Sequence, residues 1–295
     1  MTINRFDILT KVVDLKSFTK ASEVLNMTQS AVSHAINSLE SEWGVTLLIR
    51  DRKKGIALSE VGQKTLIHMR EILNRMDKIN QEIALAMNLE VGNIRIGTFS
   101  SASSCLLPKI LCKFQKKHPH IEFTFFEGTY EEIVEWLETG VIDIGFVVQQ
   151  DKKRNLNKVP LIKDKMVVAF PVDHKFEGKK TISIQELKNE PFIMPKGMYQ
   201  THVNEIFNQA NIKPLVRFEV FDCNTIANMV QEGLGITIGP ELSLKMHQNI
   251  KIGELTITNW RTVALASSLH STSSPAVQAF LKIAQTVYSQ SLTFQ

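Results

Sequence analysis

The stretch from Ser17 to Lys54 constrains this chain more than any other part of the sequence. Ser17 and Thr28 are hydroxyl residues of the kind that cap helix N-termini, and each precedes a segment with helical character. The residues between these segments, Leu25-Asn26-Met27, form a short connection suited to a tight turn. We therefore expect two short helices joined by a turn.

The second of these helices has two chemically different faces. Its apolar residues recur at helical spacing on one side: Val32, Ala35, Ile36 and Leu39. The residues on the other side are short, polar and not acidic: Ser30, Ser33, His34 and Asn37. Such a face suits the major groove of DNA, where small donors and acceptors meet base edges and phosphates. A solvated face on a small helical bundle is the alternative, and the face by itself favours that alternative.

A basic segment after the helix changes this balance. Arg50, Arg52, Lys53 and Lys54 precede Gly55, and Gly55-Ile56-Ala57-Leu58 is typical of a short strand that returns from a turn. A helix pair followed by a basic hairpin is the plan of a winged helix-turn-helix. The cations of the hairpin would lie over the phosphate backbone, where they supply affinity without sequence information. The segment as a whole therefore indicates DNA binding.

With these motifs, the chain resembles the LysR-type transcriptional regulators. The resemblance rests on elements in the family's order and spacing: Phe6, Ser17-Phe18-Thr19, Thr28-Gln29-Ser30-Ala31-Val32-Ser33, Ile36-Asn37-Ser38-Leu39-Glu40, Arg50 to Lys54 and Leu58-Ser59-Glu60-Val61-Gly62. It implies that promoter DNA is contacted by Ser17, Thr19, Thr28, Gln29, Ser30, Ser33, His34, Asn37, Arg50, Arg52, Lys53 and Lys54. Ser22, Trp43, Leu48 and Lys53 depart from the family's usual residues. A lysine in place of arginine at position 53 weakens any bidentate phosphate contact there.

The segment from Val61 to Met87 has no proline, and no glycine after Gly62, so we expect one long helix. At about 1.5 Å per residue it would extend roughly 40 Å, which is too long to pack inside a small winged domain. Residues spaced by three and four form a heptad seam: Leu66, Met69, Leu73, Met76, Asn80, Ile83 and Met87. We predict a helix that dimerises the chain and links its domains; a helix packed on its own domain is the alternative.

From Asn93 onward, apolar strands alternate with amphipathic helices, which predicts parallel sheets covered by helices. The resemblance extends here and implies a two-lobed α/β effector domain similar to periplasmic solute-binding proteins. We expect an α+β multidomain chain: a winged helix-turn-helix over residues 1–58, a linker helix over 59–89 and an effector-binding domain over 90–295. Its first lobe would comprise residues 91–163 and 267–295, and its second lobe residues 164–266. The crossings between the lobes are placed near residues 162–165 and 266–268, and a last helix from Pro275 to Tyr288 returns to the first lobe.

Hydroxyl residues cluster where strands of this domain should end. In open α/β sheets, ligands bind beyond the carboxyl ends of strands, and helix N-termini there favour anions. The candidate effector-binding residues are Ser100, Ser101, Ser103, Thr129, Phe146, Lys196, Thr201 and His202. Each serine or threonine by itself is more typical of a helix cap, but their convergence predicts a small polar or anionic effector.

Other patterns exclude several function classes. The sequence has no Gly-x-Ser-x-Gly elbow, no Walker A motif and no Gly-x-Gly-x-x-Gly loop, so we expect no enzyme and no bound cofactor. Three widely separated cysteines predict neither a disulfide framework nor a zinc site. We place Cys105 near a helix start, where its thiol pKa would fall, and an oxidant-sensing regulator that uses Cys105 is an alternative.

The net charge of +4 is compatible with a local DNA footprint but not with a bulk nucleic-acid binder. The sequence shows no membrane-spanning run and no signal peptide, so we expect a cytoplasmic protein with no membrane partner. The prediction is a LysR-type regulator that binds double-stranded promoter DNA as a homodimer or homotetramer, responds to a small-molecule effector and contacts RNA polymerase. A cytoplasmic solute-binding receptor is the second alternative.

Overall fold

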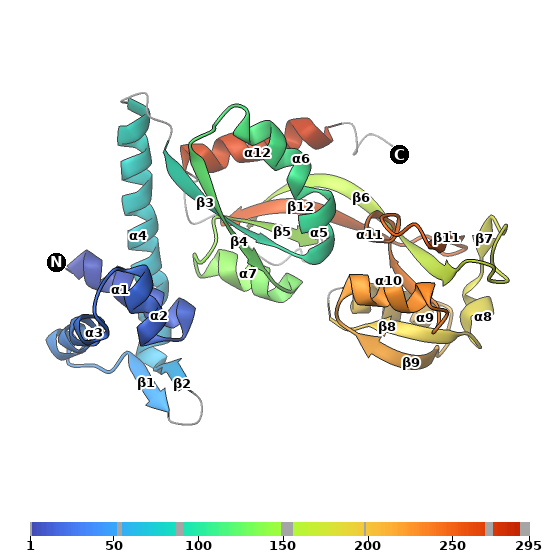
Figure 1. Cartoon of the computed structure of the whole chain (residues 1–295), viewed down its shortest axis with the longest axis horizontal. Coiled ribbons are helices and arrows are strands. Elements are labelled where there is room, and N and C mark those ends of the chain that lie inside the picture. Colours follow the sequence, from blue (N-terminus) through green and yellow to red (C-terminus); the bar gives the residue numbers. More distant parts are fainter. Residues whose placement is uncertain are drawn as a thin grey trace. The chain divides into compact units, whose positions relative to one another are not determined.

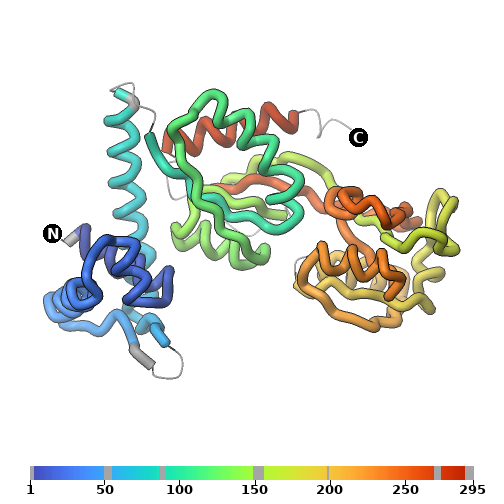
Figure 2. The backbone as a smooth tube through the Cα atoms, viewed as in Figure 1, coloured from blue at the N-terminus to red at the C-terminus, as the bar shows by residue number. Residues whose placement is uncertain are grey.

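The computed structural model describes residues 2–51, 55–86, 91–148, 156–197, 199–268 and 274–289 of the 295-residue chain. It divides into two compact units. The first comprises residues 1–92 with 138–141, and the second comprises residues 93–137 with 142–295. Figure 1 labels the helices and strands of both units, and Figure 2 follows the backbone in sequence colours.

The first unit begins with three helices, a two-stranded hairpin and a long helix: α1 (Thr2–Leu15), α2 (Phe18–Val24), α3 (Gln29–Trp43), β1 (Leu48–Asp51), β2 (Gly55–Leu58) and α4 (Glu60–Ala86). Both predicted caps are confirmed. Ser17 Oγ accepts from Lys20 N–H (3.2 Å), and Thr28 Oγ1 accepts from Ala31 N–H (3.2 Å). The strands β1 and β2 pair antiparallel, with Leu48 opposite Leu58. The winged helix-turn-helix predicted from the sequence is therefore present.

The core of this unit confirms the predicted inner face of α3. Val32, Ile36 and Leu39 are fully buried, and Ala35 is half-buried against the same core. They share this core with residues of α1, α2, β1 and α4: Phe6, Ile8, Leu9, Val12, Ala21, Leu48 and Met69. Burying large aliphatic side chains contributes on the order of 2 kcal/mol each, so this core fixes the rotation of α3 about its axis.

Helix α4 is one continuous helix, as predicted, but its seam divides into two parts. Leu66 and Met69 are buried, so the start of the seam packs on its own module, as the alternative proposed. Met76 and Ile83 are exposed farther along. An ion pair between Arg70 and Asp14 also ties α4 to α1. Met87, the last residue of the predicted seam, lies outside the residues that the structure describes.

The second unit has two lobes. The first lobe begins with β3 (Gly92–Thr98), α5 (Ser100–Cys105), α6 (Leu107–Gln115), β4 (Ile121–Glu127), α7 (Tyr130–Glu138) and β5 (Ile144–Val148). The second contains β7 (Thr181–Ile182), α8 (Ile184–Leu187), β8 (Pro191–Pro195), α9 (Gln200–Gln209), β9 (Leu215–Val220), α10 (Cys223–Gln231), β10 (Thr237–Pro240), α11 (Glu241–Leu244) and β11 (Ile250–Leu255). The pairs β3–β5 and β8–β9 are parallel, as the alternation of strands and helices predicted.

Two long strands, β6 (Leu156–Pro171) and β12 (Trp260–Ser268), connect the lobes, and both can be followed in Figure 1. Strand β6 pairs with β12 as far as Lys165, and from Met166 onward it pairs with β10 and β11 of the second lobe. The first crossing therefore lies where the sequence placed it. Strand β12 already pairs with β5 of the first lobe from Val263 to Ala266. The second crossing thus comes earlier than residues 266–268, because β12 runs antiparallel along β6 and both strands cross at the same level.

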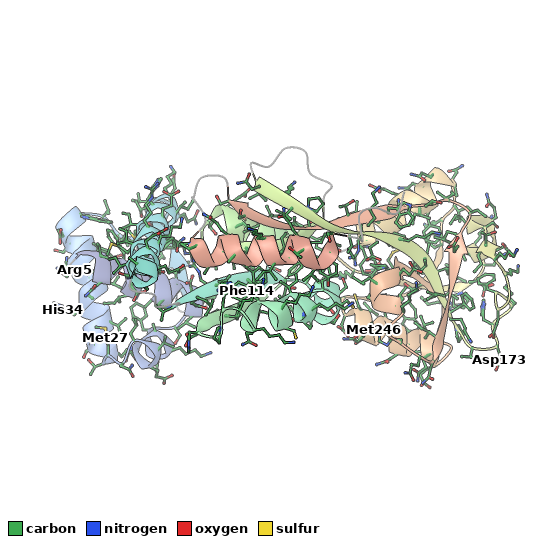
Figure 3. The ribbon with its side chains drawn as sticks, turned by 90° about the horizontal axis from the view of Figure 1, so that it is seen from above. Arg5, Met27, His34, Phe114, Asp173 and Met246 are labelled. Atoms are coloured by element: carbon green, nitrogen blue, oxygen red, sulfur yellow. The ribbon has the colours of Figure 1, made fainter. Side chains whose placement is uncertain are left out.

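Helix α12 (Pro275–Tyr288) has the predicted bounds and packs on the first lobe beside α6. Phe280 is fully buried. The centroid of its ring lies 5.4 Å from that of Phe114, which Figure 3 labels, and 5.9 Å from that of Phe123. The Tyr288 hydroxyl donates to the Leu106 carbonyl oxygen (3.0 Å). Among the described helices, none is both long and apolar enough to cross a membrane.

Replacing Phe280 by alanine should remove the aromatic contact between α12 and the first lobe. We expect Phe280→Ala to lower the free energy of unfolding by about 3 to 5 kcal/mol, the range typical of a truncated buried aromatic side chain. Urea unfolding followed by circular dichroism measures this change. Phe125→Ala, at an exposed ring in the same lobe, is the control and should cost less than about 1 kcal/mol. Equal losses in both variants would contradict the packing of α12.

Candidate nucleic-acid interface and effector site

The outer face of α3 is polar and accessible to solvent. Gln29, Ser30, His34 and Asn37 are exposed, and Ser33 is half-buried. Figure 3 labels His34 on this helix. The structure thus places on one helix face the residues that the sequence predicted to read base edges.

The other polar residues predicted near DNA lie at helix starts. Ser17 caps α2, and the exposed Thr19 lies in the first turn of that helix. Thr28 caps α3, and its Oγ1 lies 3.0 Å from Ser30 Oγ, so these hydroxyls are already ordered at the beginning of the helix. Helix N-termini with hydroxyl side chains are common phosphate-contacting groups in protein–DNA complexes.

Of the predicted basic segment, the structure describes the backbone of Arg50. Arg50 lies on β1, with its backbone opposite Ile56 of β2. Arg52, Lys53 and Lys54 lie outside the residues that the structure describes. Their contact with the DNA backbone stays a prediction from the sequence.

Glu40, on the last turns of α3, fixes the hairpin to that helix. Its Oε1 accepts from the N–H groups of Leu47 (2.6 Å) and Leu48 (3.0 Å). A close backbone approach adds to this: a Cβ atom at Gly62 would lie only 2.3 Å from the Leu47 carbonyl oxygen. The sequence identified Glu40 and Gly62 as motif residues but gave no role for either. Both residues position the backbone at Leu47, in the segment that leads from α3 into the hairpin.

A buried arginine organises the second unit. Arg261, at the start of β12, is 1% exposed, and its Nε (2.9 Å) and Nη2 (2.7 Å) both donate to Asp164 Oδ2. Its Nη1 donates to the Tyr130 hydroxyl (2.6 Å), and its Nη2 also donates to Ser101 Oγ (2.9 Å). Asp164 Oδ1 accepts from Leu242 N–H (3.0 Å). We call Arg261, Asp164, Ser101 and Tyr130 the Arg261 network.

Burial shapes the chemistry of the residues around this network. Burial raises the pKa of Tyr130, although the Arg261 charge opposes this, and it raises the pKa of Tyr199 well above its usual value. Burial likewise raises the pKa of the Cys223 thiol, whose Sγ lies 3.7 Å from the Tyr199 hydroxyl oxygen. Burial, together with the charge of Arg261, lowers the pKa of His202 to about 4. At neutral pH these four side chains are therefore uncharged around one compensated ion pair.

The structure brings some of the predicted effector residues to this place and leaves others elsewhere. Ser101 belongs to the Arg261 network, and His202 is buried close enough for the charge of Arg261 to affect it. Among the hydrogen bonds, ion pairs and ring contacts of the described residues, none joins the remaining candidates to Arg261: Ser100, Ser103, Thr129, Phe146, Lys196 and Thr201.

Local contacts account for several of those remaining residues. Thr129 Oγ1 donates to Glu132 Oε2 (2.9 Å) and accepts from Glu132 N–H (3.3 Å), which is the capping role that the sequence left open. Ser103 Oγ donates to the Ser100 carbonyl oxygen (2.9 Å). Phe146 is fully buried, Thr201 is exposed, and the exposed Lys196 has its Nζ 5.5 Å from the ring centre of Phe221.

Cys105 lies at the junction of two short helices. It is the last residue of α5, and α6 begins two residues later at Leu107. Its Sγ donates to the Leu242 carbonyl oxygen at 3.5 Å. Cys105 therefore lies close to the start of α6, as expected, and its role as an oxidant sensor stays a prediction. Within the described ranges, no group of three histidine, cysteine or acidic residues is placed to hold a metal ion.

Sequence reasoning missed Arg261, Asp164, Tyr130 and Tyr199. Arg261 bonds to partners that lie 97, 131 and 160 positions away in the chain. No short motif joins them, so neither spacing nor periodicity could have indicated the network. The single available signal was an arginine at the start of an otherwise apolar strand, Trp260-Arg261-Thr262-Val263-Ala264-Leu265.

Comparisons with known proteins cover nearly the whole chain. Residues 3–63 match the family model described as a bacterial regulatory helix-turn-helix protein of the lysR family, and residues 88–289 match the LysR substrate binding domain. An uncharacterized HTH-type transcriptional regulator of Bacillus subtilis, YvbU, is 37% identical over 291 residues, which span 98% of this chain and 99% of YvbU.

Solved structures show the same fold. A full-length OxyR variant from Pseudomonas aeruginosa has a TM-score of 0.77 at 20% identity, covering 98% of this chain and 97% of that one. Full-length CbnR complexed with its target DNA has a TM-score of 0.68 at 20% identity, covering 97% and 100%. The effector binding domain of QuiR in complex with shikimate has a TM-score of 0.62 at 24% identity, covering 68% and 98%.

The low pKa of His202 predicts a specific sensitivity to acid. The folded pKa is about 4, below the usual value of 6.5, so the unfolded chain binds this proton more tightly. The part of the folding stability that depends on a neutral His202 is complete above pH 6.5. It is lost as the pH falls towards 4, and the loss is at most about 3 kcal/mol. We expect His202→Gln to lose less stability than the wild type between pH 6.5 and pH 4.5 in urea unfolding. His120→Gln, at an exposed histidine, should keep the wild-type loss; a wild-type loss in His202→Gln would contradict the prediction.

Proposed function

This chain belongs to the LysR family of bacterial transcription regulators, and we propose that it reads promoter DNA with α3 and responds to a small polar or anionic effector bound between its lobes. Family membership establishes transcription regulation through a DNA-binding module and an effector-binding domain. The proposal adds which residues of this chain bind DNA and effector, how the chain assembles, and which class of effector it binds.

One observation carries the DNA-binding part: the two faces of α3 are separated by burial. Val32, Ile36 and Leu39 anchor the helix, and the exposed His34 and Asn37 face away from that core. Asn is a side chain that can bond adenine in a bidentate way, and Ser and His bond to base edges or phosphates. We propose that Gln29, Ser30, Ser33, His34 and Asn37 approach the major groove.

The remaining DNA contacts would supply affinity. In this proposal Ser17, Thr19 and Thr28 bind phosphates, and Arg50, Arg52, Lys53 and Lys54 lie over the backbone or the adjacent minor groove. Lysine and arginine contacts with phosphates release counterions, so they strengthen binding to all sequences and make it depend on salt. The hydrogen bonds from the Leu47 and Leu48 amides to Glu40 support this arrangement, because they hold the start of the hairpin against α3.

We propose that α4 pairs with α4 of a second copy. Exposed apolar residues on α4 follow one another at spacings of four, three and four: Ile72, Met76, Ile79 and Ile83. A stripe of this kind, with the polar Asn80 beside it, is typical of a helix–helix dimer interface. Two DNA-binding modules on one dimer would read two half-sites and gain avidity. The proposed assembly is a homodimer or a homotetramer of two such dimers.

The effector part of the proposal rests on the Arg261 network. Small-molecule sites are commonly built from a few convergent polar groups. The region around Arg261 offers a guanidinium, hydroxyls and a neutral histidine. The solved QuiR domain contains bound shikimate, a molecule that carries a carboxylate. We propose that Ser101 and His202, together with Arg261 and Tyr130, bind the effector. Ser100, Ser103, Thr129, Phe146, Lys196 and Thr201 remain candidate contacts in the effector-bound state.

Effector binding would change the relation between the lobes, and through the assembly it would change DNA bending and contact with RNA polymerase. The proposed site of action is the cytoplasm, where bacterial promoter DNA is located, and the proposed activity is binding, with no catalytic step. Two alternatives persist: a cytoplasmic solute-binding receptor, and a regulator in which Cys105 senses oxidants. The likeness in fold to OxyR is compatible with the latter but does not favour it.

Alanine substitutions on α3 and in the hairpin should have different effects on DNA binding. We expect Ser33→Ala and His34→Ala to lose the preference for the promoter over unrelated DNA, by about 1 to 3 kcal/mol, while non-specific binding persists. Lys54→Ala should weaken binding to both DNAs alike and reduce the salt slope by about one. Fluorescence anisotropy with labelled promoter DNA and a scrambled duplex measures both effects.

The control for this series is Lys64→Ala, at an exposed lysine on α4 outside the proposed interface. It should bind like the wild type. If Ser33→Ala and His34→Ala retain full discrimination between promoter and scrambled DNA, α3 does not read the sequence.

The proposed anionic class predicts which compounds stabilise the full-length chain. We would measure thermal unfolding with small carboxylates, each compared with its uncharged amide: acetate with acetamide, succinate with succinamide, benzoate with benzamide and shikimate with shikimamide. A ligand at 100 times its dissociation constant stabilises by about 2.7 kcal/mol. We expect a carboxylate to raise the unfolding temperature, its amide to have little effect, and Ser101→Ala to reduce the rise. Stabilisation by amides alone, or by no compound of the panel, would count against an anionic effector.

A further inference from the structure

The Arg261 network joins parts of the chain that belong to different lobes. We propose that it is a latch that sets the separation of the lobes, and that an effector acts by taking the Arg261 guanidinium from its first-lobe partners. The latch itself is a property of the chain without ligand, whereas its response to an effector rests on the proposed function.

The position of the ion pair makes it suitable for this role. Arg261 and Asp164 lie directly opposite each other on β12 and β6, one residue before β6 leaves β12 for the strands of the second lobe. Any rotation of the second lobe about the two crossing strands must take place next to this pair. A hinge needs few residues, and here the crossing strands provide them.

Hydrogen bonds extend from this pair into both lobes. On one side, Arg261 donates to Ser101 of α5 and to Tyr130 of α7, both in the first lobe. On the other side, Asp164 accepts from the N–H group of Leu242 on α11, in the second lobe. A continuous chain of bonds therefore links α11 to α5 and α7 through one ion pair. The bond from the Cys105 thiol to the Leu242 carbonyl oxygen makes a second contact between α5 and α11.

The hydrogen bonds between the two lobes differ in strength, and the weakest of them determine where the connection opens. The ion pair has two hydrogen bonds from the guanidinium to one carboxylate oxygen and is almost fully buried. Removing one partner would leave an uncompensated charge inside the protein. Ser101 and Tyr130 offer neutral hydroxyl oxygens, and burial raises the pKa of Tyr130, so its hydroxyl stays uncharged at neutral pH. Guanidinium bonds to neutral acceptors are weaker than those to carboxylates. The first-lobe bonds are thus the ones that yield.

The same difference in strength indicates which chemical group a ligand needs in order to compete for the Arg261 guanidinium. An anionic oxygen accepts from Arg261 more strongly than either hydroxyl does, and the hydroxyls that it displaces can themselves donate to it. The ligand would then take the place of the first lobe as a partner of the guanidinium, while Arg261 stays paired with Asp164. The separation of the lobes would change as a result.

The decisive variant removes the first-lobe hydrogen-bond partners, keeps the Phe99 ring that lies under the guanidinium, and leaves the ion pair intact. In the full-length chain, Ser101→Ala combined with Tyr130→Phe deletes two hydroxyl oxygens and no charge. A ketone-bearing amino acid at the exposed positions Gln115, in the first lobe, and Asn208, in the second, would carry spin labels without altering the native cysteines. Double electron–electron resonance, with labelled chains diluted in unlabelled ones, then measures the distribution of distances between the lobes within one chain.

The matched control is Ser274→Ala combined with Tyr288→Phe. These two side chains are also buried, and both make their hydrogen bonds inside the first lobe, to Val277 N–H and to the Leu106 carbonyl oxygen. We expect the latch variant to broaden the distribution and add a second distance population, and the control variant to match the wild type. Arg261→Lys, which keeps the charge but loses the planar fork, should behave like the latch variant.

Two results would overturn the latch: a wild-type distribution in the latch variant, or equal broadening in the control, which would indicate general loosening. If the double variant does not fold, Tyr130→Phe alone is measured, with the same expectations against Tyr288→Phe. Promoter binding by the same samples separates this proposal from the proposed function. A wild-type chain that ignores promoter DNA would refute the function and leave the distance measurement valid.

Discussion

Val32, Ile36 and Leu39 are each at most 1% exposed, and their burial against α1 and α2 determines the orientation of α3. Because successive helical residues are about 100° apart, anchoring one side fixes where the other points. The burial of the opposite face therefore holds His34 and Asn37 towards solvent. The hairpin depends on the same anchor, since Glu40 on α3 binds the backbone that leads into β1.

In the effector domain, a buried ion pair is the anchor that orients neighbouring polar groups. Two strands cross between the lobes side by side, and the ion pair of Arg261 and Asp164 lies at their crossing. Each charge would be unfavourable in the interior without the other. Their mutual compensation leaves Arg261 with donors for Ser101 and Tyr130, so one buried pair both stabilises the crossing and reaches the two helices of the first lobe. In the proposed function, DNA recognition and effector response thus both depend on rigid elements that present a few polar groups.

Local chemistry explains which features the sequence could predict. The caps at Ser17 and Thr28, the strand Gly55–Leu58 and the helix Pro275–Tyr288 follow from contacts within a few residues, and all were predicted correctly. The hydroxyl of Thr129 binds Glu132, the local cap that its sequence neighbourhood also allowed. Arg261 escaped prediction because its partners are brought together only by the folded sheet. The late placement of the second crossing has the same cause, since strand register along β6 is a property of the sheet.

The central claim, that the polar face of α3 lies against DNA, can be tested by photo-crosslinking from position 34. A benzophenone amino acid in place of His34, in the full-length chain bound to its own promoter, reacts with whatever lies within a few ångströms of that face. We expect crosslinks to bases of the promoter duplex, and fewer to a scrambled duplex. Crosslinks to protein alone, in the presence of saturating promoter DNA, would show that this face is an internal contact and would contradict the account.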